Sequence, residues 1–282
     1  MLKFLSFGSG SSGNCYYLSN GQDAIIIDAG VGIRAIKKNF LKYGINPAKI
    51  KAILVTHDHM DHSRTVGALS RLLNVKVYSS KEVLKKLNWA RLSRVEPDCC
   101  KPVEEGEPFC VGSLEVTPFR LPHDAVDNFG YSVNYQGCVF TVMTDVGRQT
   151  ENVRKYIGLS NYLVLEADYD DAMLAANPRY EKKLKDRIKS GHGHLSNVQA
   201  ARILQENYHE GLRSVWLCHL SEENNTPELA RSTVAAFLSE NGILPDRDIR
   251  LEVLSRRTVS GPWLMSEEGI SADQQLMVDF DF

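Results

Sequence analysis

The sequence predicts a layered α/β fold in which the β-sheets lie inside and helices cover them. Short apolar runs typical of strands alternate with helical patterns along the chain, and no repeat or low-complexity linker interrupts them. The 282 residues are 43% hydrophobic, which is enough to bury a large core. We therefore expect a single domain over residues 1–282.

The expected strands are short runs of β-branched, aromatic and other apolar residues that end at turn-forming residues. Several of them are apolar up to their last residue, as expected of strands in sheets that lie inside the fold. In order along the chain, they are residues 3–7, 15–18, 24–28, 52–56, 75–78, 114–120, 131–135, 139–144, 162–166, 215–219 and 251–254.

The expected helices lie between these strands, where apolar residues recur at a spacing of three or four. They are residues 33–41, 66–73, 83–87, 198–204 and 229–238, and Asn241 and Gly242 are suited to end the last of them. From about residue 266 the chain becomes polar, acidic and aperiodic. We expect this segment to be a mobile or loosely docked tail.

Charge and composition exclude several functional classes. The net charge is −2 and the pI is near 6.5, so any binding of nucleic acid must depend on local basic patches. No apolar run approaches the roughly 20 residues of a membrane helix, and we expect a cytoplasmic protein. The six cysteines include no CxxC pair, which predicts reduced structural thiols.

The strongest chemical signal is a cluster of metal-binding side chains at residues 57–62, directly after an expected strand. His57, His59, Asp61 and His62 offer imidazole and carboxylate ligands, which suit Zn, Mn or Fe. His57 and His59 are two residues apart, so an extended chain points them to the same side. Asp61 and His62 lie where the chain turns toward the next helix. This spacing suggests two metal ions.

Three further candidate ligands also follow apolar strand-like runs. They are His123, Asp145 and His219. Functional residues of layered α/β folds concentrate in the loops that follow the strands. Taken singly, each of these residues would more often be an ordinary polar residue of a loop or core edge, but their recurrence beside the first cluster favours a shared metal site.

These residues together resemble the metallo-β-lactamase fold hydrolases. The HxHxDH signature is complete in His57, His59, Asp61 and His62, and the later ligands of that family match His123, Asp145 and His219 in order. Motifs at residues 8–14, 121–125, 144–147, 193–197 and 218–225 are similar to the YycJ/WalJ-type group, which is regarded as metal-dependent 5'-to-3' DNA exonucleases. One departure is Asp168-Tyr169, where that group has Asn-His.

The resemblance implies a four-layer αββα sandwich with two divalent ions at one edge between the sheets. Zn or Mn are the expected metals, and Fe is an alternative. It implies that His57, His59 and His123 hold the first ion, that Asp61, His62 and His219 hold the second, and that Asp145 bridges them. Two adjacent ions can activate a bridging hydroxide and stabilise the oxygens of a phosphodiester displacement. Asp61 is expected to orient that hydroxide.

His194 is the expected proton donor for the leaving group. It lies just before an alanine-rich helix, at a position similar to that of the general acid in related nucleases. The alternatives are a histidine that only binds backbone at the helix start, or a proton donor role for His192. The expected substrate contacts are Ser11, Ser12, Asn197 and Ser221.

Two basic segments offer a path for a nucleic-acid backbone. The first contains Lys81, Lys85, Lys86, Arg91 and Arg94, and the second lies within residues 179–189. Charge alone favours solvated helix faces, whereas the neighbouring metal site favours contacts with phosphates. Trp89 lies within the first segment. We expect its side chain to pack into the core, and stacking on a base is the alternative.

The sequence therefore predicts a metal-dependent phosphodiester hydrolase that acts on DNA, with a 5'-to-3' exonuclease as the expected form. One alternative is a small-molecule ester, thioester or lactone hydrolase that uses the same binuclear site. A second alternative is a non-catalytic partner in cell-wall signalling or division. A site of histidines and aspartates fits catalysis better than a structural site, because structural zinc sites favour closed shells rich in cysteine.

Overall fold

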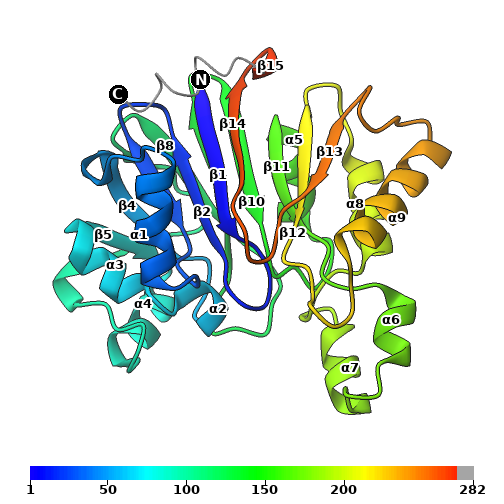
Figure 1. Ribbon diagram of the computed structural model, residues 1–282, viewed down its shortest axis with the longest axis horizontal. Coiled ribbons are helices and arrows are strands. Elements are labelled where there is room, and N and C mark those ends of the chain that lie inside the picture. Colours follow the sequence, from blue (N-terminus) through cyan, green and yellow to red (C-terminus); the bar gives the residue numbers. More distant parts are fainter. Residues whose placement is uncertain (272–282) are drawn as a thin grey trace.

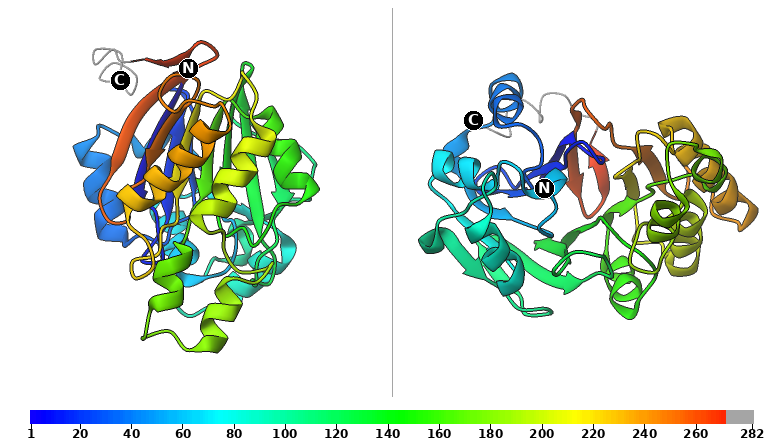
Figure 2. Two further views of the ribbon diagram at one scale, coloured as in Figure 1. Left: turned by 90° about the vertical axis from the view of Figure 1, so that its right-hand side faces the viewer. Right: turned by 90° about the horizontal axis from the view of Figure 1, so that it is seen from below.

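Two mixed β-sheets face each other between outer layers of helices in the computed structural model, which describes residues 1–271 (Figures 1 and 2). The first sheet has the strand order β15-β14-β1-β2-β3-β4-β5-β6. Its strands are β1 (Leu2–Gly8), β2 (Cys15–Ser19), β3 (Ala24–Ile27), β4 (Ile50–Leu54), β5 (Lys76–Ser79), β6 (Cys100–Pro102), β14 (Ser260–Ser266) and β15 (Gly269–Ser271).

The second sheet has the strand order β13-β12-β11-β10-β9-β8-β7. Its strands are β7 (Phe109–Val111), β8 (Leu114–Arg120), β9 (Phe129–Tyr135), β10 (Cys138–Met143), β11 (Tyr162–Glu166), β12 (Ser214–Cys218) and β13 (Arg250–Val253). In this sheet β10 to β13 are parallel, and in the first sheet β3 to β6 are parallel. Parallel neighbours end at the same edge of a sheet, so the loops after them gather there.

Helices cover the outer face of each sheet. The first sheet is covered by α1 (Ile33–Lys42), α3 (Val66–Leu73) and α4 (Lys81–Trp89), and the second by α5 (Glu151–Leu159), α8 (Asn197–Asn207) and α9 (Pro227–Glu240). The short α2 (Met60–Ser63) follows β4, and 3₁₀ turns lie at Pro47–Lys49 and Pro97–Cys99. Helices α6 (Asp171–Ala176) and α7 (Lys182–Ile188) extend below the sheets (Figure 1).

Three separate apolar cores correspond to the three interfaces between four layers. Successive side chains of a strand point to opposite faces, and β3 shows the result. Ile25 and Ile27 lie in the core between the sheets, whereas Ile26 lies in the core beneath α1, α3 and α4. A third core joins the second sheet to α5, α8 and α9. The predicted αββα sandwich is therefore confirmed, with strands that are apolar on both faces because both faces are covered.

The observed elements include every expected strand and helix, with shifted ends. The elements that were not expected are the strands β6, β7, β14 and β15 and the helices α2, α5, α6 and α7. The edge strands β6, β7 and β15 have three residues each, too few for an alternating pattern, and α6 and α7 bury few apolar side chains. The prediction of a loose tail from residue 266 is wrong up to residue 271, because β15 pairs with β14. The remainder of that tail lies outside the described residues.

Neither disulfides nor membrane-spanning helices contribute to residues 1–271. All six cysteines are free thiols, as predicted. The longest helix, α9, has 14 residues, and none of the helices in this range has the length and apolar character required to cross a bilayer.

Candidate metal centre

The seven candidate ligands meet at the edge where parallel strands of both sheets end. Residues 57–62 follow β4, and His123 follows β8. Asp145 and His219 follow β10 and β12. All seven side chains belong to groups whose ligand atoms lie within 4.8 Å of one another.

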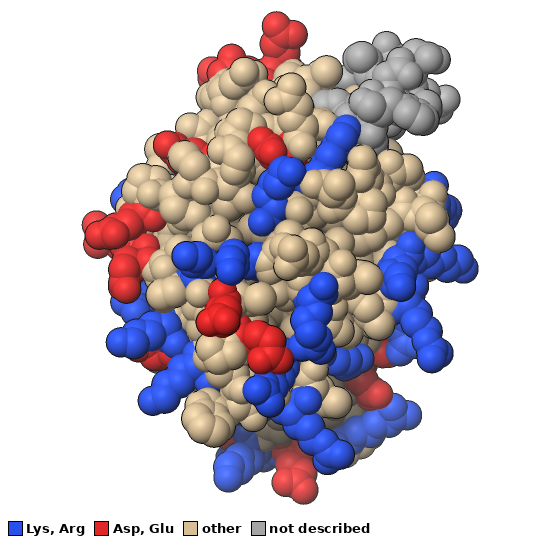
Figure 3. Space-filling model, turned by 90° about the vertical axis from the view of Figure 1, so that its left-hand side faces the viewer, with Lys and Arg blue, Asp and Glu red and all other residues tan. Residues whose placement is uncertain are grey.

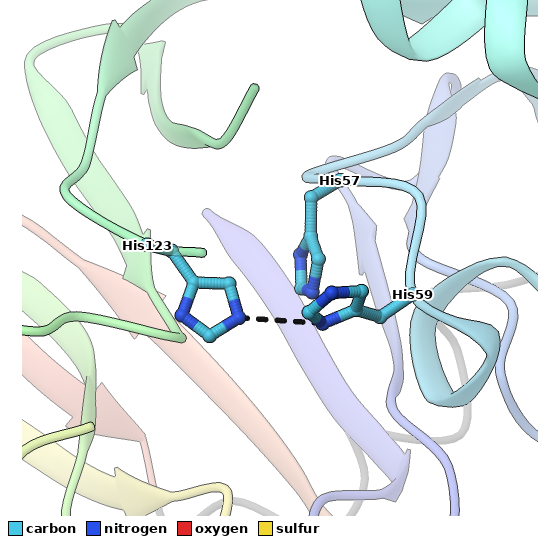
Figure 4. Close-up of side chains that lie close together, drawn as sticks. All are labelled: His57, His59 and His123. Atoms are coloured by element: carbon cyan, nitrogen blue, oxygen red, sulfur yellow. Dashed lines mark hydrogen bonds between the residues drawn. The ribbon is translucent and has the colours of Figure 1, made fainter. Parts of the chain in front are cut away.

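The first group consists of His57, His59 and His123. Figure 4 shows the loop after β4 presenting His57 and His59 toward His123, which comes from the second sheet. His123 Nε2 lies 3.3 Å from His59 Nδ1. Three imidazoles with converging nitrogens match the histidine set of a zinc or manganese site.

The second group consists of Asp61, His62 and His219. Asp61 Oδ2 lies 3.2 Å from His219 Nε2 and 3.5 Å from His62 Nε2. His62 is fully buried, whereas 22% of the Asp61 side chain is exposed. Asp61 is therefore the member of this group that solvent and substrate reach.

The Asp145 carboxylate lies between the two groups. It is 3.1 Å from His62 Nε2 and 3.7 Å from His219 Nε2 on one side, and 3.5 Å from His123 Nε2 and 3.9 Å from His57 Nε2 on the other. One carboxylate that faces both groups has the placement required of a bridging ligand.

Hydrogen bonds on the outer side of the imidazoles direct the other ring nitrogen inward. His62 Nδ1 donates to Asp28 at 2.7 Å, and His123 Nδ1 donates to the Gly193 carbonyl at 3.0 Å. The Thr56 hydroxyl donates to Asp28 and therefore accepts from His57 Nδ1. In all three rings Nε2 is left to act as a ligand, and such outer partners typically orient metal-binding histidines.

One buried nitrogen supports the fit between these residues and a metal ion. His57 Nε2 is inaccessible to solvent and has no hydrogen-bond partner within the described chain. A buried polar atom without a partner is costly, and a bound cation would satisfy it. The donor set of imidazoles and carboxylates, with no thiolate among the seven, fits a catalytic divalent ion.

The carboxylates and imidazoles of the centre shift one another's pKa. Burial raises the pKa of Asp145, but the surrounding imidazoles outweigh burial and hold it well below its usual value. Burial lowers the pKa of His62, whereas Asp145, Asp28 and Asp61 raise it well above its usual value. For His57, burial dominates and lowers the pKa. Asp145 therefore stays anionic inside the protein, which a cation ligand requires.

Three residues of the centre adopt the left-handed backbone conformation. The φ angles are +60° at Asp28, +59° at Asp145 and +55° at His219. This conformation is uncommon for residues other than glycine, and Asp, Asn and His tolerate it better than most. Asp28 and His219 were expected to be the last residues of their strands, but the left-handed turn ends each strand one residue earlier.

His194 and Glu166 form a buried pair beside the seven candidate ligands. His194 Nδ1 donates to Glu166 Oε1 at 2.8 Å, and the backbone N–H groups of Val146 and Leu195 donate to Glu166 Oε2. Burial lowers the pKa of His194, but Glu166, Asp168 and Asp145 together outweigh burial and raise that pKa to about 9. His194 Nδ1 is 3.7 Å from Asp145 Oδ1. The helix-start alternative for His194 is wrong, because Ser196 is the residue that caps α8.

A cavity of about 270 Å³ opens onto the centre. Its wall includes Asp61, Asp145, His194 and His219 together with Ser11 and Ser221. The Ser221 hydroxyl also accepts a hydrogen bond from the Asn224 backbone. Of the four expected substrate contacts, Ser11 and Ser221 thus lie at the cavity.

The other two expected substrate contacts do not reach this cavity. Asn197 is buried, and its side-chain amide exchanges hydrogen bonds with Asn225, so its role is to join the starts of α8 and α9. The expectation for Asn197 is therefore corrected. Ser12 is exposed to solvent but does not line the cavity. His192, the alternative proton donor, is exposed and contacts Arg148.

Asp168-Tyr169, which stands where the YycJ/WalJ-type group has Asn-His, contributes to the surroundings of His219. Asp168 lines the cavity, and its Oδ1 lies 3.7 Å from His219 Nδ1. Tyr169 is buried. The chain therefore has an additional carboxylate behind His219.

Two residues of the centre, Asp28 and Glu166, were not among the candidates from sequence. Each is a carboxylate at the end of a strand-like run of apolar residues, 25–27 and 163–165. The same signal identified Asp145 and His219, so these two residues could have been found. Both are fully buried, and both bind imidazoles of the centre from outside.

We predict that Asp28→Asn weakens binding of the divalent ions about 10- to 100-fold, because the anionic partner of His62 Nδ1 is lost. The asparagine keeps the size of the side chain, so the fold should persist. Competition with a chromophoric chelator measures the affinity, with Asp98→Asn, an exposed carboxylate, as the control. Equal affinities of Asp28→Asn and wild type would contradict the role of Asp28.

Comparisons with known proteins agree with this geometry. A family model described as a β-lactamase superfamily domain matches residues 23–219. Exodeoxyribonuclease YycJ of Bacillus anthracis is 30% identical over 241 residues, which cover 86% of this chain and 90% of that protein. Exodeoxyribonuclease WalJ of Streptococcus pneumoniae is 30% identical over 239 residues, which cover 84% of this chain and 88% of that protein.

The fold also agrees with that of a solved structure, the metallo-β-lactamase fold protein YhfI from Bacillus subtilis. The TM-score is 0.67 over 93% of this chain and 100% of that chain, at 15% sequence identity. At this identity the likeness concerns the fold alone. The matched family model includes all seven candidate ligands as well as Asp28, Glu166 and His194.

Proposed function

From the premise that the chain belongs to the metallo-β-lactamase superfamily of hydrolases, we propose that it hydrolyses phosphodiester bonds in DNA as a 5'-to-3' exonuclease. The observation that carries this proposal is the placement of His194 on the same cavity wall as the candidate metal ligands. Two relatives that are named exodeoxyribonucleases and match most of the chain support the choice of DNA.

Two divalent ions, Zn or Mn, fit the centre. His57, His59 and His123 would hold one ion, Asp61, His62 and His219 would hold the other, and Asp145 would contact both. When bound, such ions supply a nucleophile at neutral pH by lowering the pKa of water, and they offset the negative charge that develops on the phosphate.

The residues of the chain supply positioning and proton transfer. Asp61 is partly exposed at the cavity and accepts a hydrogen bond from the attacking water. His194 gives a proton to the leaving oxygen of the sugar, and Glu166 holds the imidazole in place through Nδ1. Because Glu166 is fully buried and bound by two backbone N–H groups, it has little freedom to move.

The two alternative functions predicted from the sequence have different outcomes. A non-catalytic role is not retained, because the chain belongs to a hydrolase superfamily. A small-molecule hydrolase would use the same centre, and the experiment below distinguishes it from a nuclease. A cytoplasmic location stays a prediction.

The experiment is the degradation of DNA labelled at the 5' or the 3' end by metal-stripped protein that has been reloaded with Mn or Zn. A 5'-to-3' exonuclease releases the 5' label as mononucleotides or short products at the earliest times, while the 3' label stays on long fragments. Both single-stranded and duplex DNA are included. Intact DNA and RNA under every metal, together with hydrolysis of a thioester or lactone, would replace the nuclease with the small-molecule hydrolase.

A further inference from the structure

A second, larger recess lies directly beside the metal cavity. It is an open groove of about 710 Å³ between α4, Met60 and Val126, with a mostly apolar floor. His59 lines both this groove and the metal cavity, so the two are continuous. A substrate that occupies the metal cavity can therefore extend into the groove.

One face of α4 forms a wall of the groove. Glu82, Lys85, Lys86 and Trp89 are spaced by three, one and three residues, so they lie on one side of the helix, and all four line the groove. The opposite side of α4, with Val83, Leu84 and Leu87, is buried in the core.

Trp89 stands at the end of this wall with 86% of its surface exposed. The expectation that Trp89 packs into the core is wrong. Trp89 lies on the side of α4 opposite the side that is buried in the core. The other tryptophans, Trp216 and Trp263, are 0% and 7% exposed. A large aromatic ring left in water beside an active-site groove offers a flat apolar surface to a ligand.

The cations of α4 and of the residues just after it are largely available to a ligand. Lys81, Lys85 and Arg91 form no ion pair with any residue in the described range, and Lys86 is 63% exposed beside Asp58 at 3.5 Å. Figure 3 shows lysine and arginine side chains gathered over the lower part of the face that α4 belongs to. Glu82 is the acidic residue on the same side of the helix.

The other basic segment has fewer available charges. Arg179 pairs with Glu223, Arg187 with Asp124 and Lys189 with Asp171. Lys185 donates to the Ala175 carbonyl. The charge on α7 and its flanks is therefore mostly used within the protein, which favours the α4 side as the path of a polyanion.

We propose that this groove binds a single-stranded segment of the substrate DNA next to the phosphate that is cut, with one base stacked on Trp89 and the backbone near Lys85. This inference rests on the proposed function and adds the form of the substrate. A base can stack on a side chain only when its face is free, as in a single strand or a frayed end, and such stacking tolerates any sequence. The continuity of the groove with the metal cavity and its available cations identify DNA as the occupant.

The test uses the intrinsic fluorescence of Trp89 in the metal-loaded, full-length protein. A phosphorothioate-linked oligothymidine of ten nucleotides, which resists cleavage, should quench the emission and protect it from acrylamide, because Trp89 is the exposed tryptophan. Trp89→Ala should bind a labelled form of this oligonucleotide about tenfold or more weakly, as expected from the loss of one stacked base. Trp89→Phe should restore binding to within a few fold.

The control is Leu41→Ala, which shortens an 87% exposed side chain on α1 away from the groove. It should bind the oligonucleotide as wild type does, and the melting temperature of every variant checks that it is folded. Wild-type affinity in Trp89→Ala, or equal affinity of wild type for a blunt hairpin duplex and for the single strand, would overturn the inference.

The two proposals can fail separately. If the wild type degrades DNA and Trp89→Ala degrades it equally well with unchanged KM, the groove inference is wrong and the proposed function stands. If the oligonucleotide binds in a Trp89-dependent manner but no metal supports cleavage, the groove inference stands and the proposed nuclease function is wrong.

Discussion

Asp145→Asn is expected to lower the rate of DNA hydrolysis on the order of 10³-fold or more. Asp145 lies between the two ligand groups, within 3.1 to 3.9 Å of four of their five imidazoles. A neutral amide cannot offset the charge of two cations as a carboxylate does. Metal ions stabilise the transition state by several kcal/mol, and each 1.4 kcal/mol of the barrier corresponds to about a tenfold change in rate. The measurement is the initial rate of nucleotide release together with the number of metal ions bound per chain.

The substitution is chosen so that the backbone is not disturbed. Asp145 has a φ of +59°, and asparagine adopts this conformation as readily as aspartate. Asp98→Asn again serves as the matched control, because it removes an exposed carboxylate that belongs to none of the ligand groups. If Asp145→Asn kept both wild-type activity and two bound ions per chain, the assignment of Asp145 as the shared ligand would be wrong.

The second large effect is expected from His194→Ala, which should slow the cleavage of DNA about 10²- to 10⁴-fold. The sugar oxygen that leaves in DNA hydrolysis is a poor leaving group without a proton, and His194 is the histidine of the cavity wall whose Nδ1 is hydrogen-bonded to the buried Glu166. Metal binding should be retained, since the seven candidate ligands are unchanged.

A change of leaving group separates proton donation from a merely structural role. A p-nitrophenyl phosphodiester leaves without a proton, so His194→Ala should slow its hydrolysis by only a few fold. His192→Ala removes an exposed histidine two residues away and is the control for loss of an imidazole. Equal losses on DNA and on the p-nitrophenyl ester would show that His194 supports the site instead of donating the proton.

Glu166→Gln should reproduce part of the His194→Ala loss. Glutamine can still accept from the backbone N–H groups of Val146 and Leu195, but it lacks the negative charge that pairs with His194. This pairing outweighs burial and lowers the pKa of Glu166 to about 2. The loss should again be larger on DNA than on the p-nitrophenyl ester. A full loss on both substrates would indicate that Glu166 acts through the metal ligand His219, whose Nδ1 lies 3.3 Å away.

Much of the centre could be predicted because its signals are local. His57, His59, Asp61 and His62 lie within six consecutive positions after one apolar strand, and their spacing indicates a strand end followed by a turn. His123, Asp145 and His219 each end a similar run. Periodicity identified the buried strands and the amphipathic helices for the same reason, since burial of one side imposes a repeat on neighbouring residues.

Other features depend on contacts between distant parts of the chain. The outer partner of His62 is Asp28, 34 positions earlier, and the partner of His194 is Glu166, 28 positions earlier. The exposed position of Trp89 depends on how α4 packs on the first sheet, and the pairing of β15 with β14 depends on an edge left open by that sheet. Asn197 was wrongly expected to contact the substrate, because only the fold shows that its side-chain amide is hydrogen-bonded to Asn225.

The amino-acid order alone thus determined the class of fold, the order of its main elements and the residues able to bind metal, because each of these depends on side chains that are neighbours along a strand or a helix turn. The tertiary structure decided which of them share a cavity, which ring nitrogens face inward, and that a lysine-lined groove ending at Trp89 continues from the metal centre. Such features arise where two sheets and their loops meet, and no local pattern encodes the distance between residues brought together from opposite halves of the chain.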